Sequence, residues 1–163
     1  MYDLIEMKMT PVKKIGQSCV LACFESFFKD YGYDITQLML INYLMTKCLC
    51  TYDGVVFEID KVSRALGLNH TRLNSILPVP AVLDKTQSIF VLLNGESKHC
   101  VRFYMNLTGE DKLVAMDPDW DSVDKLAIFD KTFLDANLFT LHLIEIPALS
   151  WVIGDLLTQY FKP

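Results

Sequence analysis

The chain has 163 residues, of which 52% are hydrophobic, and its formal net charge is −5 at pH 7. This length supports one well-buried core but is short for two domains. The acidic balance and the absence of a cluster of Lys and Arg argue against a nucleic-acid interface, since binding phosphates requires concentrated positive charge.

The first predicted helix begins after Ser18 and ends at Gly32. Its apolar residues recur with the spacing of one buried helix face, at positions 20, 21, 24, 27, 28 and 31. Ser18 is suited to the N-cap, which places Cys19 in the first turn, where unpaired backbone N–H groups and the helix dipole favour an anion. Cys19 is therefore a candidate nucleophile, although inert buried cysteine is the commoner role of this residue type.

Helical patterns fill the first part of the chain, and strand patterns follow from Thr71 onward. Two further helices are predicted at 35–47 and 57–66, and strands at 88–93, 99–105, 112–116 and 138–146. Helices followed by hairpin-connected strands are typical of an α+β fold. We expect a cleft between the two halves, with Cys19 opposite the sheet.

His99 stands at the start of one predicted strand, and Asp117 stands at the end of the next. A predicted turn separates these two strands, and Pro118 ends the second because proline cannot continue the hydrogen-bonded ladder. Antiparallel pairing brings the start of one strand next to the end of its neighbour. We therefore predict that Asp117 holds one imidazole nitrogen of His99 while the other nitrogen faces the Cys19 thiol.

The order and spacing of these motifs resemble the papain-like cysteine peptidases that process bacteriocin precursors at double-glycine leaders. The resemblance runs from about residue 10 to residue 147 and rests on the Cys19 helix start, the strand beginning at His99 and the Asp117-Pro118 strand end. It implies a papain-like fold with an N-terminal helical half packed on a C-terminal antiparallel sheet. It also implies a catalytic triad of Cys19 nucleophile, His99 general base and orienting Asp117, acting on a peptide cut after small residues such as Gly-Gly.

Two positions depart from the pattern of that family. Its members usually have glycine directly after the nucleophile, where this chain has Val20, and glutamine six residues before it, where this chain has Lys13. The nearby Gln17 is our candidate for the oxyanion-binding amide, and losing one such donor typically costs about a hundredfold or more in rate. Two alternatives stay open: an acyltransferase of the butirosin-pathway type, which would use the same triad on an acyl-thioester substrate, and a non-catalytic peptide-binding domain on this fold.

The five cysteines indicate a reducing compartment, because an odd and scattered set does not form a disulfide framework. They are Cys19, Cys23, Cys48, Cys50 and Cys100. Since the Cys-Leu-Cys spacing at 48–50 is shorter than in zinc knuckles, we predict neither a metal nor another cofactor. The acidic N-terminus lacks a signal-peptide pattern, and the apolar runs fall short of the roughly 20 residues of a membrane span, so a cytoplasmic protein is expected.

The last segment, residues 148–163, is predicted to form an amphipathic helix beyond a peptidase-like domain of residues 1–147. Its apolar residues fall at 149, 152, 153, 156, 157 and 160. Such a helix covers the domain's own surface or docks a partner, another copy of the chain or a further domain. The remaining histidines, His70 and His142, lie in predicted strands, where a structural or surface role is favoured.

Overall fold

The computed structural model describes residues 9–73, 86–93, 99–107, 112–119, 127–130, 132–133 and 139–147. In these ranges three helices precede six strands, which confirms the predicted α+β order. The helices are α1 (Cys19–Tyr31), α2 (Gln37–Met45) and α3 (Ile59–Ala65). The strands are β1 (Asn69–Leu73), β2 (Gln87–Leu93), β3 (His99–Leu107), β4 (Lys112–Met116), β5 (Ala127–Asp130) and β6 (Thr140–Glu145). The helix predicted at 148–163 lies outside the described residues.

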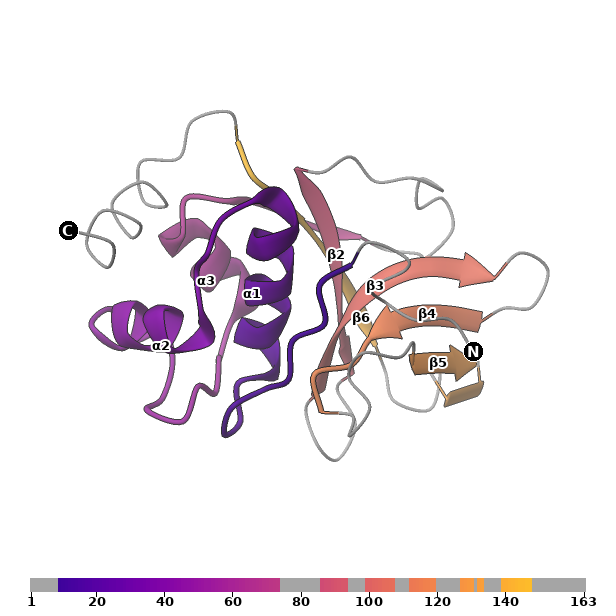
Figure 1. The fold of residues 1–163 in the computed structure, drawn as a ribbon, viewed down its shortest axis with the longest axis horizontal. Coiled ribbons are helices and arrows are strands. Elements are labelled where there is room, and N and C mark those ends of the chain that lie inside the picture. The colour runs from indigo at the N-terminus through magenta and orange to yellow at the C-terminus, as the bar shows by residue number, and fades with distance from the viewer. Residues whose placement is uncertain are drawn as a thin grey trace.

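The strands form one antiparallel sheet in the order β1-β6-β2-β3-β4-β5. Figure 1 shows the three helices together on one side of this sheet, with α1 nearest to the strands. The final strand, β6, lies between β1 and β2 and pairs with both. It therefore connects the edge strand β1 to the centre of the sheet. The strand β3, which begins at His99, therefore lies in the interior of the sheet beside β4.

Alternate residues of β2 contribute to two hydrophobic clusters on opposite faces of the sheet. Phe90 faces the helices, and its ring makes an edge-on contact with Phe24 of α1 at a centroid distance of 4.8 Å. Ile89 and Val91 belong to the second cluster, together with residues of β3, β4 and β6. Because successive strand residues point to opposite faces, a strand buried on both sides reads as the continuous apolar run found at 89–93.

The ends of α1 follow the prediction at one terminus and differ from it at the other. Gly32 ends the helix in the left-handed conformation, with φ of 102°, and its N–H donates to the carbonyls of Lys29 and Phe28. Ser18 occupies the N-cap position, but its side chain makes no capping hydrogen bond. The predicted N-cap position of Ser18 is therefore confirmed, but its hydroxyl interacts with the Ile15 carbonyl and the Gln37 side-chain oxygen instead of the first N–H groups of the helix.

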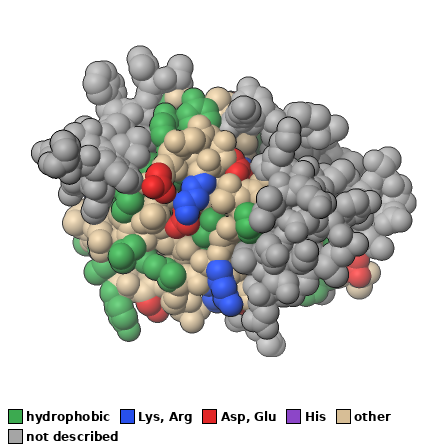
Figure 2. All heavy atoms as spheres, viewed as in Figure 1, with side chains coloured by type: hydrophobic (Ala, Val, Ile, Leu, Met, Phe, Trp, Pro, Cys, Tyr) green, Lys and Arg blue, Asp and Glu red, His purple; other side chains and the backbone are tan. Residues whose placement is uncertain are grey.

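The described surface carries hydrophobic and charged side chains side by side. On the face seen in Figure 2, the Lys and Arg side chains of the described part lie apart from one another rather than in a row. Among the described residues, none of the helices has the length and apolar character required to cross a membrane.

Candidate active site

A buried glutamine of α2 holds the loop that leads into Cys19. The Gln37 side-chain oxygen accepts hydrogen bonds from the Ile15 N–H at 3.0 Å and the Ser18 hydroxyl at 2.5 Å, and its amide nitrogen donates to the Lys13 carbonyl at 2.8 Å. Its own backbone N–H donates to the carboxylate of Glu25 on α1. Gln37 thus positions the loop before Cys19, a role that sequence analysis missed. The signal was a glutamine at the first position of a largely apolar helix.

Gly54 lets a second loop approach the start of α1. A Cβ atom at Gly54 would lie 2.4 Å from the Ser18 Cβ, and its φ of +88° is also unfavourable for a residue with a side chain. The two loops also share a hydrogen bond, in which the Gln17 N–H donates to the Asp53 carbonyl at 2.9 Å. Only glycine fits this position while Ser18, and with it Cys19, stays in place.

Replacing Gly54 with alanine should lower the free energy of unfolding by about 2–4 kcal/mol, the combined cost of overpacking and a strained φ. The matched control is Gly32→Ala, because Gly32 also has positive φ but open space around its Cβ position. That variant should cost only the conformational part, about 1–2 kcal/mol. Urea unfolding of both variants measures the difference, and equal losses would show that the contact with Ser18 has no energetic importance.

The imidazole of His99 and the carboxylate of Asp117 meet at the end of the β3–β4 pair. His99 Nε2 lies 2.6 Å from Asp117 Oδ1, and both side chains are largely buried. The same carboxylate oxygen accepts the Asp119 N–H at 2.9 Å, which fixes the carboxylate in the turn. Lys14 joins this turn to the loop before Cys19, because its N–H donates to the Pro118 carbonyl and its ammonium pairs with Asp119, both at 2.9 Å.

The ring of His99 also interacts with the Cys19 thiol. Burial alone would lower the pKa of His99, but hydrogen bonds to Asp117 and Cys19, and the negative charge of both groups, raise this pKa to about 10. The imidazole is therefore protonated at neutral pH. Since Asp117 takes Nε2, Nδ1 is the nitrogen left for the thiol.

The raised pKa predicts how His99 contributes to stability at different pH values. The folded state binds the proton more tightly than the unfolded chain, so this contribution is complete below about pH 6.5 and disappears as the pH rises to about 10. The difference in unfolding free energy between the unmodified protein and His99→Gln should therefore shrink across this window. His70→Gln is the control, because burial lowers the pKa of His70 and its contribution should not decline there. A constant difference for His99→Gln would contradict the assigned pKa.

The other predicted site residue, Gln17, is exposed in the turn before Ser18. Its oxyanion role stays a prediction. Among the cysteines, Cys23 and Cys100 are fully buried, with the Cys23 sulfur 3.8 Å from the Cys100 carbonyl oxygen, and burial raises the pKa of the Cys100 thiol. Cys48 is exposed. The structure thus brings Cys19, His99 and Asp117 together and leaves Gln17 in the adjoining loop.

Comparison with solved structures identifies the type of fold. The chain is similar to the peptidase domain of Streptococcus ComA, described as a bifunctional ABC transporter involved in a quorum-sensing pathway, with a TM-score of 0.59 and 18% sequence identity. The match covers 83% of this chain and 97% of that domain. No protein-family model matches the sequence, and no curated protein matches it. The fold is therefore that of a papain-like peptidase domain.

Proposed function

We propose that this protein performs cysteine-nucleophile acyl transfer, as a thiol peptidase that uses Cys19, His99 and Asp117. The observation that carries this proposal is the position of the His99 ring, which has the Asp117 carboxylate 2.6 Å from Nε2 and the Cys19 thiol in hydrogen-bonding contact. A nucleophile, a base and a group that orients the base are the side chains that thiol-based acyl transfer uses. The likeness of the fold to a peptidase domain supports the same reaction class.

In the proposed reaction, His99 holds the proton of Cys19 in an ion pair, and the Cys19 thiolate attacks the substrate carbonyl. The imidazolium then gives this proton to the departing amine, and a thioester on Cys19 remains. Water, deprotonated by His99, hydrolyses the thioester and releases the acid. Asp117 keeps the ring in the orientation that both proton transfers require and stabilises its charged form.

The proposed oxyanion site lies at the start of α1. The first N–H groups of this helix have no acceptor within the helix, and the Ser18 side chain does not cap them because it bonds to Gln37 instead. We assign the second donor to the Gln17 side chain, which is exposed beside Cys19 and carries an amide of the required type. Lys13 does not provide an equivalent donor, because its ammonium is a point charge on a flexible side chain rather than a planar amide.

The proposed substrate is a peptide cleaved after small residues such as Gly-Gly. This assignment rests on the sequence resemblance to bacteriocin-processing peptidases and on the fold shared with the ComA peptidase domain. A peptide precursor of this kind would enter as an extended chain, with its scissile carbonyl between the Cys19 thiol and the first N–H groups of α1. The alternatives on the same fold are transfer of the acyl group to an amine and peptide binding without turnover.

Alkylation of individual cysteines at pH 6, followed by mass spectrometry, tests the proposed nucleophile. An ordinary thiol with a pKa near 8.5 is only about 0.3% ionised at this pH. A Cys19 thiolate paired with protonated His99 should therefore react at least about tenfold faster than Cys48, which is the natural control because it is an exposed, free thiol. His99→Ala should remove this advantage. Labelling of Cys19 no faster than Cys48 would leave a binding domain as the function.

A further inference from the structure

A pocket lies at the β1–β6 end of the sheet, between α3 and these two strands. The cavity has a volume of about 710 Å³ and is lined by Asp60, Arg64, Leu68, Asn69, His70, Arg72 and His142. The strand β2 separates these edge strands from β3 and β4, which carry the candidate active site. The pocket is thus a separate feature of the fold that the proposed acyl transfer does not use.

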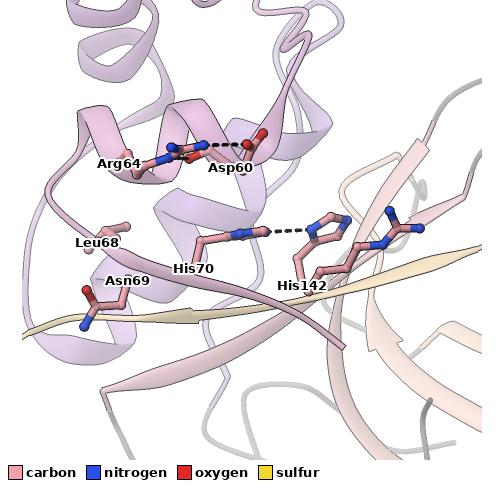
Figure 3. A pocket seen from close by; sticks show the side chains of 7 residues that line it. Asp60, Arg64, Leu68, Asn69, His70 and His142 are labelled. Atoms are coloured by element: carbon pink, nitrogen blue, oxygen red, sulfur yellow. Dashed lines mark hydrogen bonds and ion pairs between the residues drawn. The ribbon is translucent and has the colours of Figure 1, made fainter. Parts of the chain in front are cut away.

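Two histidines form the floor of this pocket. His70 Nε2 lies 2.8 Å from His142 Nδ1, and Figure 3 shows the two rings pointing toward each other from β1 and β6. His142 Nε2 lies 2.9 Å from the Thr140 hydroxyl, so both nitrogens of His142 are occupied. When the hydroxyl donates to His142 and His142 donates to His70, the remaining nitrogen of His70 is an N–H donor. The chain of hydrogen bonds then ends in the His70 N–H, which can donate to an acceptor atom of a ligand.

The charges around this pair are predominantly positive. Asp60 is paired with Arg64 on α3 at 2.7 Å, as Figure 3 shows, so these two charges largely offset each other. Arg72 stands directly across from His142 in the β1–β6 pairing, and no carboxylate of the described residues pairs with it. Burial, His70 and Arg72 together lower the pKa of His142 to about 4, while Asp60 opposes this shift only weakly. The pocket therefore presents a guanidinium and imidazole donors without a matching anion.

We propose that this pocket binds the phosphate group of a small phosphorylated molecule, held by Arg72 and the His70–His142 pair. A guanidinium presents two parallel N–H groups that match phosphate oxygens, and a third oxygen accepts from His70. A single phosphate ion would fill only part of the cavity, whose size is typical of small-molecule sites. The positive charge of Arg72 disfavours a metal cation at the histidine pair, and no three His, Cys, Asp or Glu side chains of the described part form a metal-binding group.

Histidine NMR of the full chain at pH 7 tests this assignment, with inorganic phosphate added at constant ionic strength. The ring signals of His70 and His142 should shift saturably, and their pKa values should rise when phosphate is bound because the anion stabilises the charged rings. Arg72→Gln should weaken binding about tenfold or more, since a charge-assisted hydrogen bond is lost. The matched control is Lys61→Gln, which removes an exposed positive charge of α3 that does not line the cavity.

A nucleoside monophosphate, compared with inorganic phosphate, distinguishes a phosphorylated molecule from the free ion. Tighter binding of the monophosphate supports a ligand that fills the cavity, whereas equal affinity supports the phosphate group alone. The proposal is overturned if phosphate causes no saturable shift, or if Lys61→Gln weakens binding as much as Arg72→Gln. It is also overturned if Zn²⁺ saturates the histidine signals and phosphate does not.

Discussion

Replacing Cys19 with serine should lower peptide hydrolysis by about 10⁴-fold or more, because a serine hydroxyl beside His99 is a far weaker nucleophile than the thiolate. His99→Ala should cause a loss of similar size, since the two residues act as one unit and their losses do not add. Asp117→Asn removes the negative charge that stabilises the His99 imidazolium, and we expect a smaller loss on the order of 10²-fold. Release of fragments from synthetic peptides with internal Gly-Gly pairs, followed by mass spectrometry, measures these rates.

The control for this series is Cys48→Ser, which removes an exposed thiol from the same chain and should leave hydrolysis unchanged. Acyl-carrier-protein thioesters with amine acceptors form the second arm of the experiment. Transfer of the acyl group to the amine without peptide cleavage, lost in Cys19→Ser, would replace the peptidase with an acyltransferase. Hydrolysis that survives in both Cys19→Ser and His99→Ala would contradict the proposed site itself.

Local sequence patterns predicted the three helices and the strands β2, β3, β4 and β6, whereas β1 and β5 were given no bounds from the sequence. The 3.6-residue spacing of apolar residues predicted α1, and the glycine after it ends the helix as expected, because both signals act within a few residues of one another. The antiparallel arrangement of the strands from His99 to Asp117 followed from two turns and a proline. These local signals were enough to predict that the side chains of His99 and Asp117 meet at one end of the sheet, as they do in the structure.

Contacts between distant segments were beyond the reach of the same reasoning. Ser18 is a favourable N-cap residue, yet Gln37, nineteen positions further along the chain, accepts its hydroxyl hydrogen bond and displaces the cap. Gly54 was recognisable as a turn residue, but its close approach to Ser18 depends on how two loops meet. His70 and His142 pair because β6 inserts between β1 and β2, an order that no local pattern encodes.

A buried ion pair also arises from distant segments and ties the helical half to the sheet. Arg102 of β3 faces α1, where its guanidinium pairs with Asp30 and donates to the Ser26 hydroxyl at 2.8 Å, and it donates further to Ser88 of β2 at 2.8 Å. The second oxygen of Asp30 accepts the N–H and hydroxyl of Thr10, at 2.8 and 2.6 Å. One carboxylate and one guanidinium thus connect the segment before α1, the helix and two strands.

Arg102→Met should lower the free energy of unfolding by about 3–5 kcal/mol, because it leaves the partly buried Asp30 without its counter-charge. Asp30→Asn should be similarly destabilising, since it leaves the guanidinium charge buried and unpaired. The double variant should lose much less than the sum of the two, because neither charge then remains alone. Urea unfolding of the three variants measures this coupling. The matched control is Arg64→Met, which breaks an exposed pair worth about 0–1 kcal/mol. A loss for Arg102→Met no larger than that of the control would mean that the buried pair contributes nothing to holding the two halves together.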